Sequence, residues 1–266
     1  MRGAHMSLLN SCKYSTNKNN AEIIVVDLPS ISSSDKDYIA KNLVEISKGK
    51  SSLYSAGTIA NKLSEFLKNQ SADTKKGAVA EFYITCIIRN HNYEQNHCYR
   101  NLEEGSVKKG FDGLFLFDND VWLMESKSTN TYSVHNYKHK TTINKAYVAI
   151  NDMLSGKTTN DPWENAESHA RITASNKANN NLIKKLTQLS ANYTNKQFVT
   201  ISSQNLILGS TIFADNISQI ENNIASIQTY LVNHQSKSEL VICLNVEDAD
   251  VVFFEKVLEE IKDEQQ

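Results

Sequence analysis

The sequence is poor in proline, glycine and cysteine. Only two prolines and nine glycines occur in 266 residues, which argues against a turn-dense all-β sandwich and favours helices in the long polar segments. The four cysteines lie far apart and form no CxxC pair, so the sequence indicates neither a zinc site nor a disulfide framework. We interpret them as free thiols of a reducing compartment.

Long apolar runs are also missing. No run is long enough to span a bilayer, and no secretory signal opens the chain. We therefore expect a cytoplasmic protein that does not associate with membranes. The opening hexapeptide MRGAHM, residues 1–6, is typical of an expression-vector remnant, and we assign it no function.

Charge is nearly balanced over the whole chain. The net charge of −2 means that the protein is not a polycation that binds nucleic acid unaided. Residues 138–196 differ, because they hold nine basic residues against four acidic ones. A solvated helical face explains such a stretch, and a surface that faces phosphate is the alternative. The basic residues are Lys138, Lys140, Lys145, Lys157, Arg171, Lys177, Lys184, Lys185 and Lys196.

A chain of 29.9 kDa can bury one sizeable core, with room for a small accessory domain. Apolar periodicity predicts a mixed α/β (α+β) fold. A mainly helical N-terminal region, residues 7–70, precedes a larger domain, residues 71–266, with helical additions after residue 155. We expect strands at residues 21–29, 204–213 and 239–246, and helices at 30–46, 52–67, 78–90, 140–154, 162–193 and 248–262.

The stretch KGFDGLFLFDNDVWLMESKS, residues 109–128, consists of two apolar runs separated by turn-forming residues. This pattern predicts an antiparallel hairpin. The simplest pairing takes Asn119 and Asp120 as the two-residue turn, closed by Asp118 and Val121.

In that register Asp112 lies opposite Lys127, and Leu114 lies opposite Glu125. Cross-strand partners share a face of a sheet, as do residues two apart on one strand. Asp112, Glu125 and Lys127 are therefore expected on one face, at the end of the hairpin away from its turn. A one-residue slip would separate them.

Two neighbouring carboxylates on apolar strands repel each other, and removing them from water is costly. Lys127 offsets only one of the two charges. We therefore predict that Asp112 and Glu125 hold a divalent metal, Mg²⁺ or Mn²⁺, since carboxylate oxygens suit these ions. Lys127 would orient the nucleophile or stabilise developing charge. The structural alternative is a plain ion pair.

A further acid, Glu81, is the lone carboxylate on the apolar stripe of the helix at residues 78–90. By itself it is typical of an exposed glutamate at a helix edge. Because it precedes the hairpin that carries the acid pair, we also consider it as a metal ligand or as a residue that supports the ligands.

The order of a helix with Glu, a strand with Asp and a strand with E-x-K resembles the PD-(D/E)xK nuclease superfamily, most clearly over residues 75–155. Within it, KKGAVAEFYITCIIRN followed by VKKGFDGLFLFDNDVWLMESKS is similar to the HamA nuclease subunits of Hachiman anti-phage defence. The resemblance implies a restriction-endonuclease-like core, in which a mixed central sheet is flanked by helices. It assigns the metal to Asp112, Glu125 and Glu81, and the role of catalytic lysine to Lys127.

The resemblance further implies a metal-dependent DNA endonuclease that acts with a HamB-type superfamily 2 helicase and stays restrained until the helicase meets damaged or foreign DNA. The proline that usually precedes the first aspartate is absent, and Phe111 takes its place. Two alternatives stay open: a stand-alone restriction- or resolvase-like nuclease, and a catalytically inactive nuclease-fold subunit that binds or restrains a partner.

Four residues after the hairpin are weaker candidates for a functional role. Lys138 and Lys140 are candidate DNA contacts, with solvated charge as an equal alternative. His135 and His139 lie four apart, as zinc ligands on a helix do, but no cysteine or third histidine is near. We expect both to be surface histidines.

Overall fold

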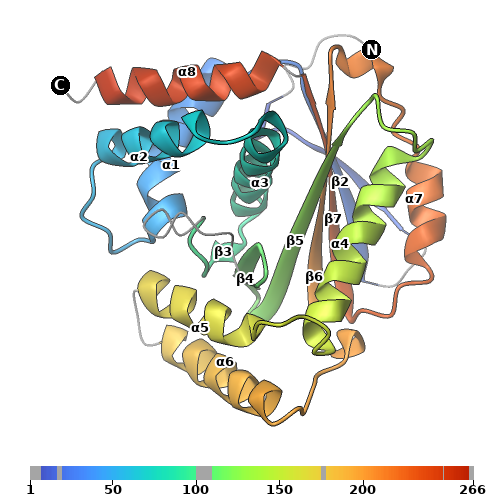
Figure 1. The fold of residues 1–266 in the computed structure, drawn as a ribbon. Coiled ribbons are helices and arrows are strands. Elements are labelled where there is room, and N and C mark those ends of the chain that lie inside the picture. Colours follow the sequence, from blue (N-terminus) through green and yellow to red (C-terminus); the bar gives the residue numbers. More distant parts are fainter. Residues whose placement is uncertain (1–6, 17–19, 100–109, 175–177, 248, 264–266) are drawn as a thin grey trace.

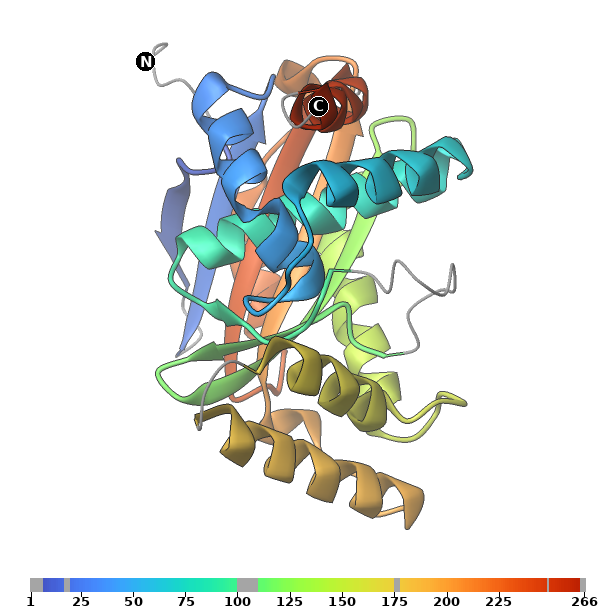
Figure 2. The same ribbon diagram turned by 90° about the vertical axis from the view of Figure 1, so that its left-hand side faces the viewer.

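A seven-stranded mixed sheet lies between two layers of helices (Figures 1 and 2). This arrangement is seen in a computed structural model that describes residues 7–16, 20–99, 110–174, 178–247 and 249–263. It confirms the expected mixed sheet flanked by helices. Residues 1–6, which we interpret as a tag remnant, lie outside the described residues.

The strands follow the order β1-β2-β7-β6-β5-β4-β3 across the sheet. The central strands β2, β7, β6 and β5 pair in parallel, while β1, β4 and β3 add antiparallel edges. β6 is buried along its whole length and β7 nearly so, as expected for parallel strands covered on both faces. The strands are β1 (Cys12–Ser15), β2 (Ala21–Leu28), β3 (Glu94–Gln95), β4 (Gly113–Phe117), β5 (Asp120–Asn130), β6 (Asn205–Ala214) and β7 (Ser238–Glu247).

Each face of the sheet has its own apolar core. One face packs against α1 (Ser33–Lys48), α2 (Ala56–Lys68), α3 (Ala72–Asn90) and α8 (Ala249–Asp263). The other packs against α4 (Lys138–Leu154), α5 (Pro162–Thr173), α6 (Ala178–Thr194) and α7 (Ile224–Leu231). Two short 3₁₀ turns, Ile201–Ser203 and Ile217–Gln219, complete the elements. No helix in these described segments is long and apolar enough to cross a membrane.

Serine caps decide where the first three helices begin. Ser32, Ser55 and Ser71 each accept a hydrogen bond from the backbone N–H three residues later, which satisfies one of the free donors of a first turn. Because Ser71 caps it, α3 begins at Ala72 rather than at residue 78. The sequence prediction began this helix at residue 78 and left residues 72–77 outside it, and it was wrong there.

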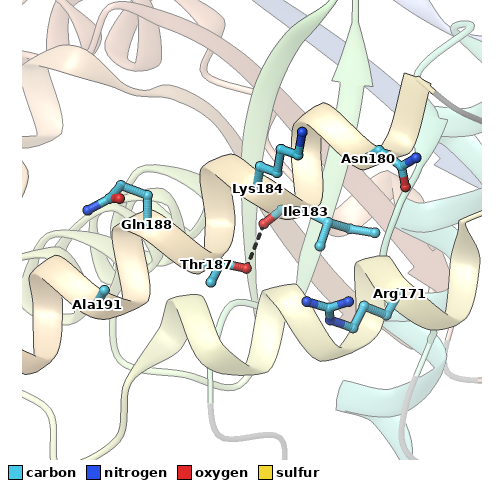
Figure 3. Close-up of a pocket in the computed structure, with 7 residues that line it drawn as sticks. All are labelled: Arg171, Asn180, Ile183, Lys184, Thr187, Gln188 and Ala191. Carbon is cyan, nitrogen blue, oxygen red and sulfur yellow. Dashed lines mark hydrogen bonds between the residues drawn. The ribbon is translucent and has the colours of Figure 1, made fainter.

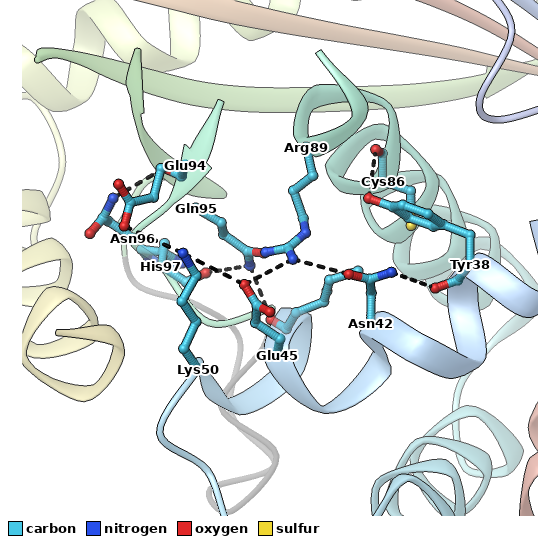
Figure 4. A network of polar contacts seen from close by, with 11 residues as sticks. Tyr38, Asn42, Glu45, Lys50, Cys86, Arg89, Glu94, Gln95, Asn96 and His97 are labelled. Atoms are coloured by element: carbon cyan, nitrogen blue, oxygen red, sulfur yellow. Dashed lines mark hydrogen bonds and ion pairs between the residues drawn. The ribbon is translucent and has the colours of Figure 1, made fainter. Parts of the chain in front are cut away.

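The N-terminal region shares the sheet and core with the rest of the chain. β1 and β2 lie at one edge of the sheet, and a polar network joins α1 to α3 and β3 (Figure 4). Its centre is Arg89, whose guanidinium lies 2.9 Å from Glu45 and also donates to Asn42 and Gln95. The division into regions 7–70 and 71–266 stays a prediction.

Candidate active site

The β4–β5 hairpin carries three of the predicted site residues, in a register that differs from the predicted one. Phe117 pairs with Asp120, and Leu114 pairs with Leu123 rather than with Glu125. The turn is therefore formed by the residues at 118 and 119, whose φ angles are 50° and 64°. Positive φ at both positions defines the type I′ turn, and Asp and Asn tolerate it.

The predicted pairing was thus wrong by two residues. Because side chains alternate with a period of two, a shift of two leaves every residue on its predicted face. Asp112 still lies on the face of Glu125 and Lys127. The contacts agree, since the backbone N–H of Ser126 donates to Oδ2 of Asp112 at 2.8 Å.

Glu125 and Lys127 form a close ion pair on β5. The Lys127 ammonium lies 2.5 Å from Oε1 of Glu125. The Glu125 carboxylate is almost fully buried, whereas the Lys127 side chain is 37% exposed. Lys127 therefore connects a buried acid to the surface, where a substrate would approach.

Burial and neighbouring charge both act on these groups. Burial, and then the charge of Asp112, raise the pKa of the Glu125 carboxyl to about 8, although Lys127 pulls it down. Burial alone would lower the pKa of Lys127, but the charges of Glu125 and Asp112 outweigh it, so that this pKa is raised. The two carboxylates, Asp112 and Glu125, thus carry one more charge than Lys127 can balance.

One oxygen of the acid pair suits a cation. Oε2 of Glu125 is buried and has no hydrogen-bond partner among the residues that the structure describes. A buried acceptor left in this way is costly, and a divalent cation would satisfy it. Across the described ranges, however, no group of three or more His, Cys, Asp and Glu side chains is placed to hold an ion. Asp112 and Glu125 fit Mg²⁺, which commonly binds one or two carboxylates and keeps several waters.

Glu81 lies on α3 and is only 8% exposed, so its interpretation as an exposed glutamate was wrong. Its charge raises the pKa of Glu125, although it is the smallest of the named contributions. Glu81 is therefore close enough to act on the acid pair electrostatically. Its role as a metal ligand stays a prediction.

One protein-family model matches nearly the whole chain. The family model named HamA matches residues 8–261. The chain belongs to the HamA family. Membership indicates a component of a Hachiman anti-phage defence system. A comparison with curated proteins found no match.

The HamA match extends well beyond residues 75–155, which carry the resemblance in the sequence. It includes the N-terminal strands and helices and the C-terminal third up to residue 261. The wider relationship to PD-(D/E)xK nucleases stays a prediction.

In this HamA chain the candidate DNA contacts lie at the start of α4. Lys138 donates to the backbone carbonyl of His135 at 3.0 Å. The Lys140 ammonium lies 5.5 Å from the centre of the Tyr230 ring on α7. Both lysines are partly exposed, so each is accessible to a phosphate.

His139 is not a surface residue, so that expectation was wrong for it, while His135 is exposed. Its Nδ1 contacts Ser210 Oγ at 2.7 Å, and its Nε2 contacts Asn245 Oδ1 at 2.9 Å. Burial lowers the pKa of His139 to about 4, which keeps it neutral at physiological pH. The helical spacing of His139 with the buried Ile143, Ala146 and Ile150 was the signal that sequence reasoning missed.

The structure also holds a groove of about 580 Å³ between α5 and α6 (Figure 3). Arg171 lines it and forms an ion pair with Glu167 at 2.5 Å. The described residues that line this groove include none of the four predicted site residues, so it is separate from the acid pair.

Proposed function

We propose that this HamA chain is a metal-dependent DNA endonuclease, the effector subunit of a Hachiman system that acts in the cytoplasm with a helicase partner. The observation that carries the proposal is the buried Oε2 of Glu125, which has no partner among the described residues although Asp112 and Lys127 lie beside it. A structural ion pair gains little from a second acid at this place, whereas a metal site requires it.

Each residue of the site has a role that follows from its position. A divalent cation, when bound, polarises the scissile phosphate and lowers the pKa of the attacking water. Asp112 is held by the Ser126 N–H through Oδ2, which fixes the direction of its carboxylate. Lys127 would exchange its contact with Glu125 for the nucleophile or a phosphate oxygen, where its charge stabilises the transition state. Glu81 would support the acid pair from α3.

The nearly neutral charge of the chain fits dependence on a partner. A nuclease with a net charge of −2 gains little from long-range attraction to DNA. We infer that the helicase delivers the DNA, and that the nuclease stays restrained until the helicase meets damaged or foreign DNA.

Cleavage of supercoiled plasmid with Mg²⁺, with and without the helicase, tests the proposal. We expect nicked or linear product from the wild-type chain and none from the double variant Glu125→Ala, Lys127→Ala. The double variant Lys13→Ala, Glu22→Ala is a matched control, because it removes an ion pair on the exposed β1–β2 edge. Equal loss in both would indicate damage to the fold.

The close Lys127–Glu125 contact specifically favours the alternative of an inactive binding subunit, in which the acids serve an ion pair. The same assay separates the two. Intact plasmid in every reaction, including the one with the helicase, would support the binding subunit and overturn the nuclease.

A further inference from the structure

The face of the sheet that bears the acid pair is the one covered by α4. Lys127 of β5 is aligned with Ser210 of β6, and aligned residues of neighbouring strands share a face. Ser210 Oγ contacts His139 and Thr142 of α4. Glu125 and Lys127 therefore point toward the layer that contains α4.

Helix α4 returns antiparallel to β5, so residues that follow Thr142 lie beside the acid pair. Further along the helix, the Tyr147 hydroxyl accepts from the backbone N–H of Gln235, which lies shortly before the start of β7. Lys145 lies three residues past Thr142, a rise of about 4.5 Å in a helix. Glu125 lies two residues before Lys127, about 6.6 Å along a strand. Lys145 is thus level with the segment between Lys127 and Glu125.

One flank of α4 is covered by α7 and the residues after it. Lys140 lies over the Tyr230 ring, and the Tyr230 hydroxyl donates to Asn144. The ring of Tyr147 stacks on His234 with 3.8 Å between centroids. Figure 1 shows α4 between α7 and β5. The other flank of α4 therefore faces the β5 side.

Lys138 and Lys145 lie on that other flank, since they are seven residues apart and each residue turns a helix by about 100°. Lys145 is exposed and forms no ion pair with any described residue. It is therefore a cation at the rim of a site in which three acids, Glu81, Asp112 and Glu125, outnumber Lys127. The divalent cation proposed for the acid pair brings the charge of that site close to zero, so a rim cation supplies the attraction for phosphate that the site itself lacks.

We propose that Lys145 forms a phosphate-binding subsite: its ammonium binds a backbone phosphate of the nucleic acid next to the phosphate that is cleaved. This inference rests on the proposed nuclease function. Lys138, a predicted DNA contact, lies on the same flank and extends the subsite toward the N-terminus of α4. Lys140 lies on the flank that α7 covers.

The test measures binding of a short DNA duplex in Ca²⁺, at several salt concentrations, under whichever condition the wild-type chain binds, alone or with the helicase. Lys145→Gln should weaken binding about five- to tenfold and reduce the slope of log K against log salt by about 0.9. Lys145→Arg should retain most of the affinity. Lys41→Gln is the matched control, an exposed lysine within α1 on the opposite layer.

The outcomes distinguish the inference from the function on which it rests. If the wild-type chain binds and cleaves DNA and Lys145→Gln behaves as Lys41→Gln does, the subsite is wrong and the nuclease stands. If the wild-type chain neither binds nor cleaves DNA, with or without the helicase, the nuclease is wrong and the subsite with it. Unchanged melting temperatures of both variants show that binding, and not folding, is compared.

Discussion

The ammonium of Lys127 lies 2.5 Å from Oε1 of Glu125, two residues earlier on the same face of β5, while Oε2 of the same carboxylate has no partner among the described residues. One oxygen of the buried Glu125 carboxylate thus contacts a cation, and the other has no such contact among the described residues. Asp112 adds a second negative charge beside it. An arrangement that is costly for the fold is a reason to expect a function for it.

The first prediction concerns this cost. Glu125→Gln should stabilise the metal-free protein by roughly 1–3 kcal/mol at pH 8, because it removes a buried charge. The folded-state pKa of Glu125, about 8, lies above the ordinary glutamate value of 4.5. Its ionisation therefore costs stability increasingly as pH rises from about 4.5 to about 8. Urea unfolding of both proteins at pH 5 and pH 8 measures the gap, which should widen with pH.

An exposed acid provides the comparison. Glu22→Gln removes a carboxylate from β2, where its side chain is 44% exposed, and its effect should stay within about 0.5 kcal/mol. A Glu125→Gln protein less stable than wild type at pH 8 without divalent ions would mean that the ion pair is a net stabiliser of the fold.

The hairpin register gives a second prediction. Asn119 has a φ of 64°, whereas Asp120 lies in β5 opposite Phe117. Asn119→Val should cost about 1–3 kcal/mol, because a β-branched residue is strained at positive φ. Asp120→Val should cost less than about 1 kcal/mol, since valine favours a strand and only an exposed ion pair with Lys237 is lost. Thermal unfolding of the two variants decides, and similar costs for both would favour the register predicted from sequence, in which both residues lie in the turn.

The error in the register shows which features of the hairpin can be predicted from the sequence and which cannot. The apolar runs and the turn residues predicted the hairpin, and the period of two placed Asp112, Glu125 and Lys127 on one face. Which two of Asp118, Asn119 and Asp120 form the turn was not predictable, because Asp and Asn both tolerate turn geometry. The closing pair depends on packing of both strands against the two cores.

Elsewhere, the sequence predicted the apolar strands correctly and missed a polar one. The expected strands at 204–213 and 239–246 correspond to β6 and β7, which are buried on both faces. The polar strand β1, which is exposed along its length, carries no apolar alternation and exists because it pairs with β2. The helical region expected at 162–193 consists of two helices, because α5 ends at Thr173 and α6 begins at Ala178. Long-range pairing and chain reversal decide such segments.

The third prediction concerns Gly209 of β6, which packs against α3 and against β5 beside the acid pair. A Cβ atom there would lie 2.6 Å from Ile84 Cδ1 and 2.7 Å from Cβ of Ser126, the residue between Glu125 and Lys127. Gly209→Ala should therefore destabilise the protein by about 1–3 kcal/mol and disturb the acid pair. Chemical denaturation measures the first effect and the plasmid assay the second.

Gly77 is the matched control for that substitution. Its added Cβ would meet only Ser128 Oγ, at 4.0 Å, and it lies within α3. Gly77→Ala should thus stabilise the protein by about 0.5–1 kcal/mol, the usual gain of alanine over glycine in a helix. Equal stability of both alanine variants would contradict the close packing of β6 against β5 and α3.

Binding of Mn²⁺ to the purified chain, followed by electron paramagnetic resonance, tests most directly whether Asp112 and Glu125 form a metal site. We predict one bound ion for the wild-type chain, at least tenfold weaker binding for Asp112→Asn and for Glu125→Gln, and unchanged binding for Glu22→Gln. Loss of a carboxylate ligand removes both charge and coordination, which explains the size of the effect. Equal Mn²⁺ binding by all four proteins, or none by any of them, would contradict the account.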